Sequence, residues 1–96
     1  MEIKKESNIS ESRKQELGVN GWAPWEKEAS TFDWSYTETE TCLILEGEVT
    51  VKTEAGESVE AGAGDLVQFP EGLQCTWNIT SDLRKVFTFE PVELSS

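Results

Sequence analysis

Histidine is absent from this chain of 96 residues, and only two cysteines, Cys42 and Cys75, are present. Imidazole and thiolate are common ligands of structural and catalytic zinc, so the chain offers few side chains for such a site. In a reducing compartment, two cysteines are expected as free thiols rather than as a disulfide.

Basic residues are also scarce: eight Lys and Arg stand against nineteen Asp and Glu, for a net charge of -11. An acidic surface repels phosphate backbones and anionic lipid, so we expect no nucleic-acid partner and no membrane partner. The charge is spread along the chain, and this pattern favours a role in solubility over an acidic docking surface.

Long hydrophobic runs are absent, and no stretch has the length of a membrane span. The first six residues, Met-Glu-Ile-Lys-Lys-Glu, do not have the apolar centre of a secretory leader. We therefore expect a cytoplasmic protein.

Bulky apolar residues are present despite this polarity, since the chain has four Trp and four Phe within a hydrophobic fraction of 36%. Its length suits a single domain with one core, and so small a domain gains buried area by dimerising. Trp22 and Trp25 lie in a segment that reads as an edge strand, because Pro24 cannot donate to a ladder. We expect a homodimer that covers this edge, and the alternative is that Trp22 and Trp25 pack onto their own barrel.

The order of patterns along the chain predicts three parts. Residues 1–20 form an arm in which 1–9 are polar and frayed and 11–17 are a short helix, capped by Ser10 and ended by Gly18. Residues 21–90 alternate with period two and predict a barrel, and residues 91–96 are a polar tail. The expected strands lie near 22–25, 32–36, 41–45, 49–53, 58–59, 66–69, 75–79 and 86–89.

Short strands separated by Gly-rich turns are typical of an antiparallel sandwich or barrel. Glu46-Gly47-Glu48 interrupts the apolar run before residue 49, and Ala55-Gly56 predicts a hairpin turn. The fold class is therefore all-β with one short N-terminal helix.

The run from Gly64 to Cys75 carries the most specific pattern: Gly, five residues, Pro70-x-Gly72, two residues and Cys75. It resembles the second motif of the cupin superfamily, in which a metal-binding His stands where this chain has Cys75. Glu40, followed by six residues and Gly47, is similar to the end of the first cupin motif. Trp34 and Tyr36 occupy the places of that motif's two His residues.

This resemblance covers about residues 33–78 and implies an antiparallel jelly-roll β-barrel of the RmlC-like cupin type. The order Trp25-Glu26-Lys27-Glu28, Phe32-Asp33-Trp34 and Glu40-Thr41-Cys42 is also similar to small cupins related to ureidoglycine aminohydrolase and to the ethanolamine-utilisation group.

Alternate residues on a strand point to the same side, so the resemblance implies a set of inward side chains at the barrel mouth. The expected ligand-binding residues are Trp34, Tyr36, Glu40, Cys42, Cys75 and Trp77, with Gln68 as a further candidate. Of the family's metal ligands, Glu40 and Cys75 are the ones that remain capable of coordination. A stable zinc site needs three or four ligands, so we expect no metal and no cofactor.

Three functions are compatible with such a mouth. Aromatic walls and one carboxylate predict a cage for a small molecule, with an amine or a ureido compound as ligand. An aminohydrolase-like enzyme would use Glu40 as base or Cys75 as nucleophile, and no activating partner is evident. A non-catalytic interaction dimer is the third, with the aromatics filling the interior as core residues.

Overall fold

The computed structural model of the chain describes residues 2–94 and contains one α-helix, α1 (Glu11–Leu17), one short 3-10 turn, Val19–Gly21, and a sheet of seven strands. The strands are β1 (Lys4–Glu6), β2 (Ala23–Lys27), β3 (Ser30–Ser35), β4 (Glu40–Thr53), β5 (Ser58–Gly62), β6 (Leu66–Phe69) and β7 (Gln74–Thr88). All pairings are antiparallel. The predicted all-β fold with one short helix is confirmed.

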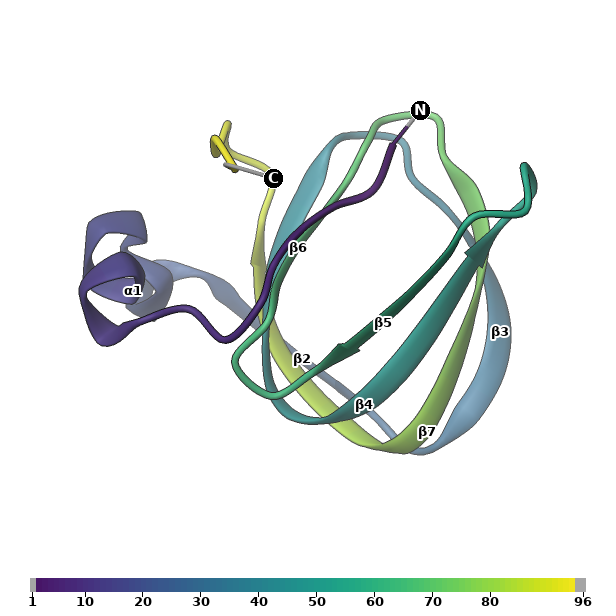
Figure 1. Cartoon of the computed structure of the whole chain (residues 1–96), viewed down its shortest axis with the longest axis horizontal. Coiled ribbons are helices and arrows are strands. Elements are labelled where there is room, and N and C mark those ends of the chain that lie inside the picture. The colour runs from purple at the N-terminus through teal and green to yellow at the C-terminus, as the bar shows by residue number, and fades with distance from the viewer. Residues whose placement is uncertain (1, 95–96) are drawn as a thin grey trace.

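The two long strands β4 and β7 run through both layers of the molecule (Figure 1). In one layer, Thr41 of β4 lies between Gln68 of β6 and Thr88 of β7. In the other layer, the second part of β4 lies between β5 and the first part of β7. Strands β2 and β3 pair with the two parts of β7 and extend one layer each.

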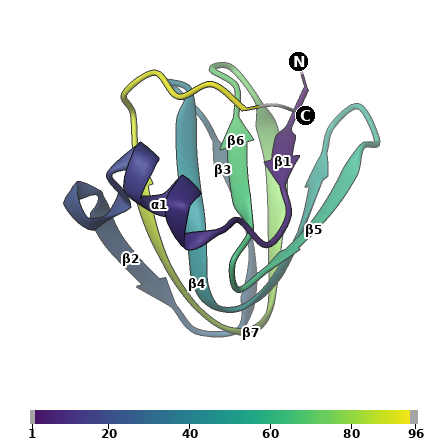
Figure 2. The same ribbon diagram turned by 60° about the vertical axis from the view of Figure 1, so that its left-hand side comes forward.

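The sheet does not close on itself, so the predicted jelly-roll barrel is an open one. Within residues 2–94, strands β1, β2, β3 and β5 each pair with a single neighbour, which leaves four edges. Between the β1 and β5 edges there is a side-chain contact instead of a ladder, because Lys5 Nζ donates to the backbone oxygen of Glu60 at 2.6 Å. The architecture is a jelly-roll-like sandwich (Figure 2).

Two predicted interruptions are absent from the long strands. The chain bends at Glu46-Gly47-Glu48 without leaving the sheet, since β4 and β7 stay paired through register shifts between Ile44 and Val49. Such bulges bend a strand and increase its twist. Residues 80–85, which the sequence did not assign to a strand, likewise belong to β7.

The N-terminal arm is more ordered than its polarity predicts. Strand β1 pairs with β6, and Ile3 is buried in the core, which corrects the expectation of a frayed arm for residues 2–9, while residue 1 lies outside the described residues. Helix α1 has the predicted caps, since Ser10 accepts from the Arg13 N–H and Gly18 adopts a left-handed conformation. Arg13 also binds the carboxylate of Glu6 and the backbone oxygen of Glu93, so the arm and the tail are joined.

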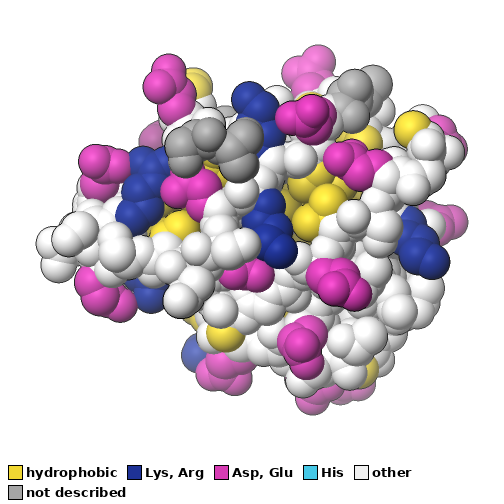
Figure 3. Space-filling view, in the orientation of Figure 1, with side chains coloured by type: hydrophobic (Ala, Val, Ile, Leu, Met, Phe, Trp, Pro, Cys, Tyr) yellow, Lys and Arg dark blue, Asp and Glu magenta, His cyan; other side chains and the backbone are white. Residues whose placement is uncertain are grey.

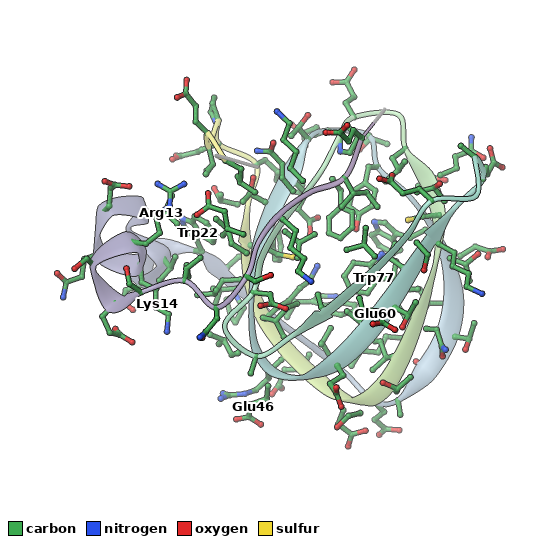
Figure 4. All side chains as sticks on the ribbon, in the orientation of Figure 1. Arg13, Lys14, Trp22, Glu46, Glu60 and Trp77 are labelled. Atoms are coloured by element: carbon green, nitrogen blue, oxygen red, sulfur yellow. The ribbon has the colours of Figure 1, made fainter. Side chains whose placement is uncertain are left out.

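Two apolar clusters stabilise the fold. The larger one fills the space between the sheets and includes Trp77. The smaller one joins α1 to the outer side of β4 and β6 through Leu43 and Leu66, with Trp22 packed against it (Figure 4). Trp25 packs against the larger cluster. The rings that motivated the predicted dimer edge therefore contact their own chain.

No helix in the described part of the chain is long and apolar enough to cross a membrane. Acidic side chains are scattered over the face shown in Figure 3, with lysines and arginines among them.

Gly47 is expected to be essential for the bend. Its φ is +90°, and a Cβ there would lie 2.3 Å from the backbone oxygen of Asp82. We predict that Gly47→Ala lowers the free energy of unfolding by roughly 2–5 kcal/mol, from backbone strain and overpacking together. The matched control is Gly56→Ala, which has a φ of +93° but open space around it and should cost about 1–2 kcal/mol. Equal losses in urea denaturation would contradict this role.

Candidate functional site

A cavity of about 210 Å³ opens between the sheets and is walled mainly by aromatic rings. Its lining consists of Trp25, Phe32, Trp34, Tyr36, Glu40, Trp77, Lys85, Phe87 and Phe89. Trp34 and Phe89 are 47% and 51% exposed and stand at the rim. Tyr36, Glu40, Trp77 and Lys85 are all buried and form the floor.

Strand parity and one turn place these rings. Phe32 and Trp34 are two residues apart on β3, and Phe32 lies opposite Trp77 of β7 with stacked rings 6.2 Å apart. Tyr36 follows β3, and its position is fixed by the turn at Pro70–Gly72: its N–H donates to Leu73 and its carbonyl accepts from Gly72. The Pro70–Gly72 turn of the second cupin-like motif thus fixes the position of Tyr36, which belongs to the first motif.

A buried ion pair forms the polar part of the floor. Lys85 Nζ donates to Glu40 Oε2 at 2.8 Å, and the two side chains are 7% and 8% exposed. A buried carboxylate needs a partner of this kind, because an unpaired charge in an apolar interior is costly. The structure supplies Lys85 as this partner.

Lys85 was missed by the sequence analysis, although a signal for it exists. It is two residues from Leu83, which is buried, and two from Phe87, which lines the cavity, so alternation along β7 places it on the inner face. Reading residues 80–85 as part of a strand would have identified it as the inward cation.

Three aromatic rings surround the Lys85 ammonium. Its Nζ lies 4.6 Å from the ring centroid of Trp77, 4.9 Å from that of Trp25 and 5.7 Å from that of Phe87. Distances below about 6 Å give a favourable cation–π attraction, which is stronger where water is excluded. The aromatic cage predicted for a ligand therefore holds a cation of the protein itself.

Two further polar groups lie buried beneath the cavity surface and make no hydrogen bond of good geometry within residues 2–94: the hydroxyl of Tyr36 and the indole nitrogen of Trp77. Burial raises the pKa of Tyr36 well above its ordinary value, and the negative charge of Glu40 acts in the same direction. The indole N–H lies close enough to the Tyr36 oxygen to oppose part of the rise in the Tyr36 pKa. Tyr36 is thus a neutral phenol at ordinary pH. Buried unpartnered donors are uncommon and call for an explanation.

The structure separates both cysteines and Gln68 from the cavity, which corrects their predicted place. Cys42 shares the inner face with Glu40 but lies deeper in the packed core, where it is fully buried, and burial raises its pKa to about 11. The Cys75 thiol donates to the backbone oxygen of Trp34 at 3.6 Å and does not line the cavity, and burial raises its pKa. Gln68 binds Thr41 and the Val92 carbonyl.

The two candidate metal ligands do not form a metal site together. Glu40 is bound to Lys85, whereas Cys75 lies outside the cavity lining. Among residues 2–94, no group of three or more His, Cys, Asp and Glu side chains has a suitable arrangement for a metal ion.

Comparison with known proteins gives a match to a family model over most of the chain. The model, described as EutQ-like cupin domain, matches residues 14–87. Over 76 residues the chain is 30% identical to a protein named acetate kinase EutQ from Escherichia coli (strain K12). That match includes 79% of this chain but 31% of the relative, so the chain spans about a third of that protein's length.

Solved structures show the same fold. A DUF861 family protein from Thermotoga maritima is 45% identical, with a TM-score of 0.88 over 93% of this chain and 100% of the other. The Clostridium difficile EutQ protein is 18% identical, with a TM-score of 0.64 over 96% of this chain and 70% of the other. The second likeness concerns the fold alone.

Breaking the buried Glu40–Lys85 pair should lower the free energy of unfolding far more than breaking the exposed Arg84–Glu46 pair. Lys85→Met leaves the Glu40 carboxylate buried without a cation, and we predict a loss of about 3–5 kcal/mol in the free energy of unfolding. Arg84→Met is the matched control, because Arg84 and Glu46 form a pair at 2.6 Å that is 49% and 63% exposed. That change should cost about 0–1 kcal/mol.

Combining Lys85→Met with Glu40→Gln should restore part of the loss, since it removes the stranded charge. Urea denaturation of the parent chain, Lys85→Met, Glu40→Gln and the double variant forms a double-mutant cycle. Additive losses would show that the two charges do not interact.

The raised pKa of Tyr36 predicts that the free energy of unfolding falls at alkaline pH. Because its folded pKa is raised, only the unfolded chain ionises near the ordinary value of 10.0. The stability from this group is complete below that pH and is lost as the pH rises above it. Tyr36→Phe should therefore flatten the decline in stability above pH 10.0, with the contribution of Cys42 unchanged. Tyr36 is the only tyrosine, so tyrosinate absorbance that appears before unfolding would contradict this prediction.

Proposed function

Because this chain belongs to the EutQ-like cupin family, we propose that it is a small-molecule-binding cupin whose ligand enters the aromatic cavity between its two sheets. The observation that carries the proposal is the open, aromatic-walled cavity with the exposed rings of Trp34 and Phe89 at its rim. A ligand there would remove the apolar surface of these rings from water.

The dimensions of the cavity favour a compact ligand. Its volume of about 210 Å³ lies below the roughly 300–1,000 Å³ of sites for drug-sized molecules. Trp34 and Phe89 offer apolar surface at the rim, and the polar groups are concentrated on the floor. Such a site suits a small molecule with an apolar part and one polar end. From the sequence, the ligand classes considered are amines and ureido compounds.

The enzymatic alternative has less support. An aminohydrolase-like reaction would need Glu40 as a free base or Cys75 as a nucleophile, but Glu40 is paired and Cys75 lies outside the cavity lining. The activity in the name of the Escherichia coli relative belongs to a protein of which this chain spans 31%. The third alternative, a purely structural dimer, does not account for an open cavity.

We also propose a cytoplasmic location and no nucleic-acid or membrane partner. The net charge of -11 supports the second statement, because an acidic protein repels phosphate backbones and anionic lipid, and acidic side chains occur across the face shown in Figure 3. The two free, buried thiols of Cys42 and Cys75 are compatible with a reducing compartment.

A thermal-shift screen against amines, ureido compounds and sugars tests the binding function. A ligand present at one hundred times its Kd adds about 2.7 kcal/mol of stability, which should raise Tm by about 10 °C or more in a domain of this size. Trp34→Ala should reduce the shift, because it removes apolar surface from the rim.

The matched control is Leu45→Ala, since Leu45 is 39% exposed and does not line the cavity. Equal shifts for Trp34→Ala and the parent chain would place the ligand elsewhere.

We further propose that the protein forms a homodimer. The rings of Trp22 and Trp25 no longer motivate this, but Trp34, Leu45 and Phe89 remain exposed, and β2 and β3 have one neighbour each in the described sheet. Light scattering at micromolar concentration should give twice the chain mass of 10.7 kDa. A monomer mass would rule out the dimer under these conditions.

A further inference from the structure

The rim of the cavity offers aromatic surface to a ligand from both layers of the sandwich. Trp34 belongs to β3, whereas Phe89 directly follows β7 in the other layer, where Thr88 pairs with Thr41. Trp34 meets Phe32 edge-on, with centroids 6.4 Å apart and planes at 85°, and about half of its side chain stays exposed. Phe89 is half exposed as well. Ring surface therefore remains available on both sides of the opening.

The rest of the lining is also aromatic, apart from one ion pair. Every described residue that lines the cavity carries an aromatic ring except Glu40 and Lys85. These two bind each other at 2.8 Å and neutralise each other's charge. The cavity thus presents ring surface to a ligand and no unpaired charge.

A cationic ligand finds its natural place occupied. The ammonium of Lys85 fills the space between the carboxylate of Glu40 and three rings of the lining, those of Trp25, Trp77 and Phe87. We call this space the cation seat. A ligand amine would have to displace Lys85 or add a second positive charge beside it, and both steps are costly in a buried space.

An anionic ligand is disfavoured by charge. Among the described residues of the lining, Lys85 is the one cation, and Glu40 already neutralises it. A ligand carboxylate would leave one net negative charge in an aromatic cavity. The net charge of -11 adds a repulsion at longer range. The ligand that meets neither cost is uncharged.

Building on the proposed binding function, we propose that the cavity takes a small uncharged aromatic compound, and that Lys85 sets this preference by filling the cation seat. The ligand ring packs against Trp34 and Phe89, where aromatic pairs add to the burial of apolar area. A closed apolar cavity of about 150 Å³ takes up one benzene molecule, so the volume of about 210 Å³ suits a single substituted ring.

Four probes of similar size separate charge from aromaticity: benzyl alcohol, benzylamine, benzoate and cyclohexylmethanol. Each is titrated into the full chain while the indole resonances of Trp34, assigned by their loss in Trp34→Phe, are followed by NMR. We expect benzyl alcohol to bind most tightly. Benzylamine and benzoate should bind about tenfold more weakly, because each brings a charge into the cavity. Cyclohexylmethanol should bind about threefold more weakly, because it forms no aromatic pair.

The outcomes distinguish the ligand class from the binding function. If benzylamine, benzoate or cyclohexylmethanol binds in the cavity as tightly as benzyl alcohol, the ligand class is wrong while the binding function stands. If none of the four probes shifts the Trp34 resonances, the ligand class is wrong. The binding function then fails as well only if the thermal-shift screen gives no ligand that depends on Trp34.

Lys85→Ala tests the role of the cation seat. The change empties the seat and leaves the Glu40 carboxylate beside the three rings, so the ammonium of benzylamine can take the vacant place. We expect benzylamine to bind this variant more tightly than benzyl alcohol does, the reverse of the order in the parent chain. If the variant is unfolded on its own, benzylamine should restore its folding where benzyl alcohol does not. Failure of benzylamine in both respects would overturn the role of Lys85.

Phe89→Leu tests where the ligand ring lies. It removes one aromatic pair from the rim and should weaken benzyl alcohol about threefold. The Tm should change little, because Phe89 is 51% exposed. The matched control is Leu45→Ala, which loses apolar surface outside the cavity lining and should leave the affinity unchanged. Unchanged affinity in Phe89→Leu would contradict ring packing at the rim.

Discussion

The ion pair between Glu40 and Lys85 is the constraint on which the rest of the site depends. It joins the start of β4 to the second part of β7 and places two opposite charges in an interior that is otherwise aromatic. Each charge requires the other, because both side chains are buried. The rings of Trp25, Trp77 and Phe87 then gain a second role beside packing, since they stabilise the ammonium by cation–π attraction. The cavity lies above this pair, whose two side chains belong to its lining.

Bends and turns of the backbone position the Glu40–Lys85 pair and the residues around it. The bend at Gly47 lets β4 and β7 contribute to both layers, so that the pairing of β4 with β7 carries Lys85 and Trp77, while Glu40 begins β4 opposite Phe69 of β6. The turn at Pro70–Gly72 fixes Tyr36 by two backbone hydrogen bonds. Asp65, next to the turn glycine Gly64, accepts N–H groups from Asn8 and Gly62, which ties the N-terminal arm to the same motif. The conspicuous Gly and Pro residues of the sequence are explained by these turns, independently of any metal.

Much of the fold could be predicted from sequence because its signals are local. Ser10 and Gly18 marked the ends of α1, alternation marked the strands, and the register of Glu40 with Gly47 gave the inward side of β4. The limits were equally physical. Parity gives the face of a strand but not the depth, so Cys42 was placed at the mouth although it lies in the core. Lysine is usually exposed, which hid Lys85. Closure of the sheet depends on long-range pairing, which no local pattern encodes.

The central claim is that Lys85 occupies an aromatic cage, and NMR of the lysine side chains tests it most directly. Protons close to the faces of several aromatic rings resonate strongly upfield. The account predicts one lysine with strongly upfield ε-methylene resonances, contacts in NOE spectra to Trp25 and Trp77, and loss of these signals in Lys85→Met. Lysine ε-methylene resonances that all lie in the solvent-exposed range would contradict the cage. That result would also mean that the aromatic cage is free to bind a cationic ligand.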